Sequence, residues 1–161
     1  MVNSIKNMPS NARVWVYQSV RMLTSAEVDA ILIEGKKFVE NWSAHGAVLN
    51  AGFEIMYDRF IVLCVDEEQA MASGCSIDKS VQFIKQLEQQ FGLNLFDRMQ
   101  VAYKQGEIIH ACSLAEFEKM AAAYHVNENT IVFNNMITTK LGFETEWEVP
   151  LKKSWQNRVL A

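Results

Sequence analysis

The residues best suited to chemistry lie in the segment ASGCSID at positions 72–78, where a buried strand is expected to lead into a helix. A helix N-terminus presents unpaired backbone amides and about half a positive charge, which suits a carboxylate or a phosphate. The candidate ligands for such an anion are Ser73, Gly74 and Ser76. The same field activates a thiol. Cys75 is therefore a candidate nucleophile, with His45 from the turn-like stretch WSAHG as its base.

A second interpretation of this segment needs no ligand. Ser76 or Asp78 can cap the helix, because serine and aspartate are favoured N-cap residues. Cys75 is then a small buried side chain, since free cysteine is among the most buried residue types. Asp78 also counts against a bound anion, because a carboxylate in the first turn already uses the helix dipole. Capping is the more common role for such a segment.

Two carboxylates, Asp66 and Glu67, directly follow the apolar run at 60–65. The ends of buried strands often line functional sites, so Asp66 is a candidate base and the pair is a weak candidate for a divalent metal. The same pair also fits a strand end that returns to solvent. We expect no zinc site, because no cysteine or histidine pair has the short spacing that zinc ligands show.

Arginines beside apolar strands are candidate carboxylate ligands, because a guanidinium binds a carboxylate through two parallel hydrogen bonds. These arginines are Arg13, Arg59 and Arg98. Each can instead pair with a neighbouring aspartate, such as Asp58 or Asp97. The tryptophans can stack on a planar ligand or fill the core. They are Trp15, Trp42, Trp147 and Trp155.

The composition is that of a globular protein. We expect a single domain over 1–161, with residues 1–10 poorly ordered. The chain is 50% hydrophobic and carries a net charge of −4 without a basic cluster, which argues against disorder and against nucleic acid as a partner. The longest apolar run is far shorter than the ~20 residues of a membrane helix. With no signal peptide apparent and an odd number of cysteines, a cytoplasmic protein is expected.

Hydrophobic periodicity indicates strands and helices in alternation. A capping box at Thr24 and Glu27 starts a helix that reaches Trp42, and Gly92 ends a second helix over 76–91. A third helix begins after Ser113. The expected strands are 13–20, 53–57, 60–65, 99–103, 107–112, 130–133 and 143–149, the last an edge strand with an acidic face. This order predicts an α+β fold with a mainly antiparallel sheet and helices on one face. A ferredoxin-like core with added C-terminal strands is the leading topology.

Eight short segments look familiar when they are taken together. They are RVWVYQ at 13–18, WSAHG at 42–46, YDRFI at 57–61, VDE at 65–67, SGCSID at 73–78, LFDRM at 95–99, NTIVFNN at 129–135 and WEVP at 147–150. In this order, and over nearly the whole chain, they resemble a family of short bacterial proteins that often carry the label of ABC-transporter ATPase. The resemblance brings no catalytic residues with it.

The ATPase label conflicts with the residues. Such an enzyme needs the loop G-x-x-x-x-G-K-[ST], whose amides and lysine hold the phosphates. The chain's Gly-Lys pair, Gly35-Lys36, is followed by Lys37, has Ala30 in place of the first glycine and lies inside the first predicted helix. The apolar strand before Asp66 supplies only half of such a site. We therefore expect no ATP hydrolysis and treat the label as an artefact.

Two functions remain open from the sequence. The first is a cytoplasmic domain that binds a partner protein or a small anionic ligand, as a possible homodimer and without a cofactor. The second is a thiol-dependent enzyme with Cys75 as nucleophile and His45 as base, in which amides near Ser76 stabilise an oxyanion. A structure that brings 73–78, His45 and Asp66 into one pocket would favour the second.

Overall fold

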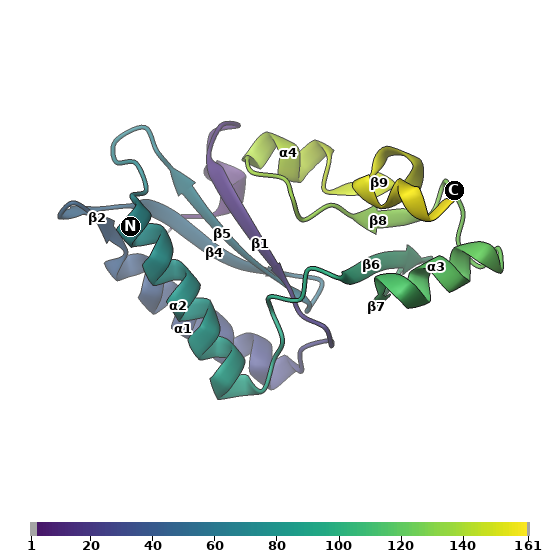
Figure 1. Ribbon diagram of the computed structural model, residues 1–161. Helices are drawn as coiled ribbons and strands as arrows, with labels where there is room; N and C mark the ends of the chain where they lie inside the picture. The colour runs from purple at the N-terminus through teal and green to yellow at the C-terminus, as the bar shows by residue number, and fades with distance from the viewer. Residues whose placement is uncertain (1–2, 161) are drawn as a thin grey trace.

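The computed structural model describes residues 3–160, in which most strands form two antiparallel sheets that pack face to face (Figure 1). The first sheet has the order β1-β5-β4, with β1 at Arg13–Gln18, β5 at Phe60–Asp66 and β4 at Asn50–Met56. Both outer strands run antiparallel to β5, so they are parallel to each other with β5 inserted between them. The free edge of β1 is therefore an edge of this sheet.

Two long helices cover one face of the first sheet, and the second sheet covers the other (Figure 1). The helices are α1, Ser25–Asn41, and α2, Gly74–Phe91. Alternate side chains of β5 serve the two faces, with Leu63 in the helix-side cluster and Val62 in the cluster between the sheets. A strand apolar on both sides is expected where both faces are covered. The apolar run at 60–65 therefore matches the central position of β5.

The second sheet has the order β7-β6-β8-β9. Its outer face packs on α3, Leu114–Ala122, and on the 3-10 helix η3, Trp155–Leu160. The molecule is thus built as helices, sheet, sheet, helices. The strands are Gln100–Gln105 (β6), Ile108–Ser113 (β7), Ile131–Phe133 (β8) and Glu148–Pro150 (β9). The short elements are η1 (Ile5–Asn7), β2 (Ser43–Ala44), β3 (Ala47–Val48), α4 (Lys140–Thr145) and η2 (Leu151–Lys153).

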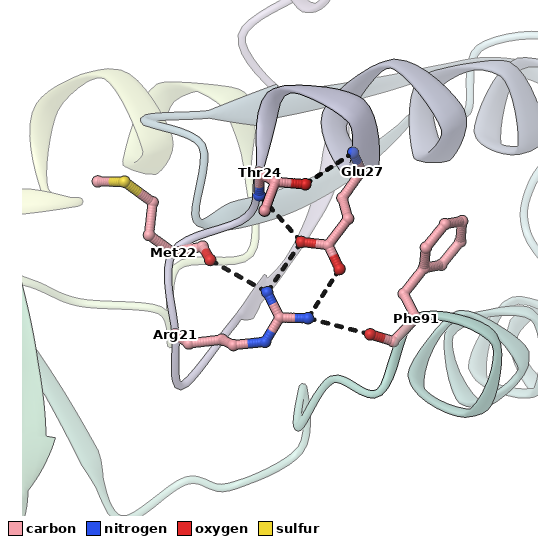
Figure 2. Close-up of polar contacts among 5 residues, drawn as sticks. All are labelled: Arg21, Met22, Thr24, Glu27 and Phe91. Atoms are coloured by element: carbon pink, nitrogen blue, oxygen red, sulfur yellow. Dashed lines mark hydrogen bonds and ion pairs between the residues drawn. The ribbon is translucent and has the colours of Figure 1, made fainter.

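Local signals place the start of α1 and the end of α2 as the sequence predicts. Thr24 and Glu27 form the expected capping box at the start of α1. Arg21 binds both carboxylate oxygens of Glu27, at 2.8 and 2.7 Å, and also donates to the carbonyl of Phe91 at the end of α2 (Figure 2). Gly92 then takes a left-handed conformation with φ of 62°. One arginine therefore links the start of α1 to the end of α2.

The α+β class and the antiparallel pairing are confirmed, but the ferredoxin-like arrangement is not formed. In that fold the strand after the second helix joins the sheet beside the first strand. Here β6 pairs with β7 and β8 in the second sheet, and the free edge of β1 stays without a strand along most of its length.

The predicted edge strand at 143–149 is wrong for most of its length. Thr139 caps the short helix α4, and only β9 is a strand, at the edge of the second sheet. Phe143 and Trp147 are four positions apart, a spacing that also fits a helical turn, and their rings stack at 4.6 Å. Alternating apolar residues in so short a segment therefore suited both structures.

The N-terminal segment that the sequence predicted to be poorly ordered packs on the core where the structure describes it. Ile5 and Met8 are buried between the sheets. The Lys140 ammonium donates to the Met8 carbonyl at 2.7 Å, and the Asn3 amide donates to the Ala51 carbonyl at 2.9 Å. Residues 1 and 2 lie outside the described part of the chain.

Candidate functional site

The predicted anion-binding segment at 72–78 forms a closed cap. Ser73 is the N-cap of α2, in place of Ser76 or Asp78, and its hydroxyl accepts from the Ser76 amide at 3.1 Å. The Ser76 hydroxyl in turn accepts from the Ser73 amide at 2.7 Å. These two amides are therefore already satisfied. Gly74 faces open space, and Cys75 is exposed at the first turn instead of buried.

His45 lies in the turn that follows β2 and has no hydrogen bond with Cys75 in the described chain. It occupies the turn between β2 and β3 with φ of 51°, and it is exposed. The indole of Trp42 donates to the Ser76 carbonyl at 2.8 Å, which fixes the end of α1 against the start of α2. Within residues 3–160, no hydrogen bond connects the thiol of Cys75 with the His45 ring. The pairing needed for a thiol enzyme stays a prediction.

Asp66 and Glu67 organise the loop after β5. Asp66 accepts from the Glu68 amide at 3.1 Å, and Glu67 accepts from the Ala72 amide at 2.8 Å. Glu67 also lies 3.7 Å from the Arg13 guanidinium. The described residues contain no cluster of three or more Asp, Glu, His or Cys side chains that could hold a metal ion. Both carboxylates thus have local partners.

Arg59 is used inside the fold. Its side chain is buried and donates to the carbonyls of Ser19 and Val20, at 3.3 and 3.1 Å. Burial lowers the pKa of this guanidinium. No hydrogen bond or ion pair joins it to Asp58 within residues 3–160. Arg59 therefore fixes the chain after β1, and its role as an anion ligand stays a prediction.

A cavity of about 850 Å³ lies along the free edge of β1, between the two sheets and beside α2. Its wall is largely apolar and aromatic, with Trp15, Tyr17 and Phe96 on the side of α2, and Phe133 and Ile137 on the side of the second sheet. Of the segment at 72–78, only Ile77 lines it, and neither His45 nor Asp66 does. The predicted thiol site and the carboxylates after β5 thus lie outside this cavity.

The edge of β1 exposes backbone groups to this cavity. The Ser19 amide points toward β5 and donates to the Arg59 carbonyl. The amides of Val14 and Val20 point to the opposite edge, where they donate to the carbonyls of Thr138 and Asn94 at 3.0 and 3.2 Å. Successive amides of a strand point to opposite edges. The intervening amides of Val16 and Gln18 therefore point to the free edge, where the described residues offer them no partner.

Gln18, which lines the same cavity, carries a buried side-chain donor without a partner in the described chain. Gln18 is 8% exposed, and its Nε2 has no hydrogen-bond partner within residues 3–160. Its orientation is fixed by a short chain of bonds. The Trp147 indole can only donate, so it defines Asn135 Oδ1 as an acceptor, at 2.9 Å. Asn135 Nδ2 then donates to Gln18 Oε1 at 2.8 Å, which leaves Gln18 Nε2 as the free donor.

The charged residues around the cavity are mainly cations. Arg98 and Lys85 are exposed and have no hydrogen bond or ion pair with another residue of the described chain. Burial raises the pKa of the Tyr17 hydroxyl and the charge of Arg98 opposes the shift, so Arg98 lies near Tyr17. Asp97 is already bound by the Met99 amide and the Gln100 side chain, at 2.9 and 3.4 Å.

Four residues that the sequence singled out lie in the wall of this cavity. Arg13, Arg98, Trp15 and Trp155 were candidates for carboxylate binding or stacking, and all four line the cavity. Gln18 and Asn135 were missed as functional residues. The available signal was a glutamine on a strand face that otherwise carries Val14 and Val16.

Comparison of the chain with protein-family models, with curated proteins and with solved structures finds no match. Within residues 3–160, no helix is both long enough and apolar enough to cross a bilayer. The candidate site is therefore characterised from the residues that line the cavity.

Proposed function

We propose that this protein is a binding domain that takes an organic anion with an apolar body into the cavity beside β1. The observation that carries the proposal is an apolar and aromatic cavity of about 850 Å³ that also holds two cations, Arg98 and Lys85, without a hydrogen bond or ion pair in the described chain. Ligand cavities commonly combine apolar walls with a few fixed polar groups.

The distribution of charge supports an anionic ligand. Arg98 is free to bind a carboxylate through two parallel hydrogen bonds, with Lys85 as a second cation. Trp15 and Tyr17 add apolar and aromatic surface to the wall of the same cavity. Among the described residues that line the cavity there is no Cys, His or Ser. The set of groups therefore suits binding better than nucleophilic catalysis.

The location of the protein, its source and its family belong to the same proposal. A cytoplasmic location is supported by the three cysteines, all of which are free thiols. A bacterial source and membership of the family labelled ABC-transporter ATPase rest on the resemblance alone. A partner protein and a homodimer remain alternatives for the same binding role.

Calorimetric titration with decanoate and with decanol tests the proposal, because the two probes share an apolar chain and differ in charge. We expect saturable 1:1 binding of decanoate and at least about tenfold weaker binding of decanol. Arg98→Gln should weaken decanoate binding about tenfold, whereas Lys37→Gln, on the distant helix α1, should leave it unchanged. Equal affinities for the two probes, or no saturable binding of decanoate, would overturn the proposal.

A further inference from the structure

We infer that the ligand of this cavity is an extended peptide with acidic side chains, which adds a strand to the free edge of β1. This inference rests on the proposed function, because it names the class of anion that the same cavity binds. Its starting point is the pair of outward amides at Val16 and Gln18, which lie on an edge that no other strand of residues 3–160 covers. Addition of a strand to an open sheet edge is a common way in which proteins bind peptides.

The length of the open edge defines the length of the peptide. Bonds from Val14 to Thr138 and from Val20 to Asn94 close the edge at its two ends. The open stretch lies between these residues, so it spans less than about 20 Å at ~3.3 Å per residue. It therefore accommodates three to five peptide residues, a number that follows from the same spacing of roughly 3.3 Å. An open strand edge is otherwise a liability for aggregation, and a dedicated partner removes it.

The two faces of β1 define the side chains of the peptide. Residues of a paired strand alternate between faces as their partners do. Tyr17 lies on the face of the helices, where Arg98 and Lys85 supply two free positive charges. Val16 lies on the opposite face, against the apolar cluster between the sheets. We therefore expect acidic residues on the face of Tyr17 to alternate with apolar residues on the face of Val16.

Gln18 adds its outward backbone amide to this edge. Its side chain shares the face of Val14 and Val16, and the residue lines the cavity with Asn135. A small fatty acid offers one carboxylate and no backbone, so it would leave the amides of Val16 and Gln18 unpaired. The edge thus favours a peptide over other anions with an apolar body.

The test uses the peptide acetyl-Val-Glu-Val-Glu-Val-amide in calorimetric titrations with the full chain. We expect saturable binding and at least about tenfold weaker binding of the charge-reversed peptide with lysine in place of glutamate. Arg98→Gln should reduce this preference, with Lys37→Gln as the matched control on α1. Equal binding of the acidic and basic peptides would overturn the inference. If decanoate binds and the peptide does not, the inference fails and the proposed function stands.

Methylated peptides test the strand pairing itself. Methyl groups on the valine nitrogens block the donors that face β1 in an antiparallel pair, and methyl groups on the glutamate nitrogens block those that point away. A parallel pair gives the reverse. We expect one methylated peptide to lose at least about tenfold in affinity and the other to bind like the parent. Equal affinity of the two methylated peptides would overturn the inference, as would a dimer of the protein that excludes the peptide.

Discussion

At the scale of single residues, the arginines show how one residue type serves different roles in this chain. Arg59 is buried and bound to two carbonyls, and Arg21 is held by Glu27. Arg13 lies 4.9 Å from the Trp15 ring centre and 3.7 Å from Glu67. Arg98 alone among these four has neither a hydrogen bond nor an ion pair within residues 3–160. Arg98 can therefore bind an external carboxylate with all of its donors.

The Arg21–Glu27 pair predicts a loss of stability in acid. The hydrogen bond from Arg21 lowers the pKa of Glu27 from 4.5 to about 2, with help from the Thr24 amide. The folded state therefore prefers the ionised carboxylate. This contribution is fully present above pH 4.5 and is lost as the pH falls toward 2. Glu27→Gln should lower the melting temperature at pH 7 and flatten its decline below pH 4.5.

Thermal unfolding between pH 7 and pH 2.5 is the measurement, with Glu40→Gln as a control on the same helix. Glutamine can still serve in a capping box, so the variant removes the charge with little effect on the cap. If the melting temperatures of Glu27→Gln and the parent fall by the same amount across this range, the prediction is contradicted.

At the scale of elements, close approach between β4 and its neighbours depends on glycine. A Cβ atom at Gly52 would lie 2.4 Å from the Asn3 carbonyl oxygen and 2.8 Å from the Cys64 sulfur. The first contact is backbone, and the second belongs to a fully buried side chain. Gly52→Ala should therefore displace the N-terminal segment from the sheet and destabilise the fold by about 1–3 kcal/mol.

Urea unfolding measures this change, with Gly74→Ala as the matched control. A Cβ at Gly74 meets nothing within 4 Å, and the residue lies in the first turn of α2. Alanine favours a helix by up to about 1 kcal/mol over glycine, so this variant should be neutral or more stable. Equal free energies of unfolding for the two variants would show that the approach of Asn3 does not need glycine.

Elements with local signals could be predicted from the sequence, and those that depend on distant partners could not. The cap at Thr24 and the stop at Gly92 involve neighbours within one turn, so their patterns identify the ends of α1 and α2. The partner of β6 is chosen by packing between the sheets, which no local pattern records. The spacing of Phe143 and Trp147 fits both a strand and a helical turn. In the structure Thr139 caps α4, which ends at Thr145, before Trp147.

At the scale of the whole molecule, the candidate site exists only because two sheets meet. Gln18 and Asn135 are 117 positions apart in sequence, and their bond joins β1 to the chain after β8. The sequence could nominate Arg98 and Trp15 by residue type alone. It could not identify Gln18 Nε2 as a donor without a partner, because that property depends on how Trp147 orients Asn135.

A polar cluster on the other side of the sheet interface predicts how the two sheets are held together. Tyr57, in the turn between β4 and β5, donates to a carboxylate oxygen of Glu148 at 2.7 Å. Lys104 of β6 forms a close ion pair with the other oxygen of Glu148. Its ammonium also lies 5.0 Å from the centre of the Tyr57 ring. The cluster therefore connects the β4–β5 turn to two strands of the second sheet.

The protonation states of Lys104 and Tyr57 predict that the cluster stabilises the fold less at high pH. The hydrogen bond to Glu148 raises the pKa of Lys104, and burial together with Glu148 raises the pKa of Tyr57. Because the folded state holds both protons more tightly, the stabilisation is present below the ordinary values of 10.0 and 10.5 and is lost as the pH rises through the raised values. Glu148→Gln should lower the free energy of unfolding by about 1 kcal/mol at pH 7, and the difference from the parent should shrink above pH 10.

Urea unfolding at pH 7 and pH 11 measures both differences, with Glu146→Gln as a control that has no ion pair in the described chain. A difference that stays constant between the two pH values would assign the effect to packing instead of the charge of Glu148.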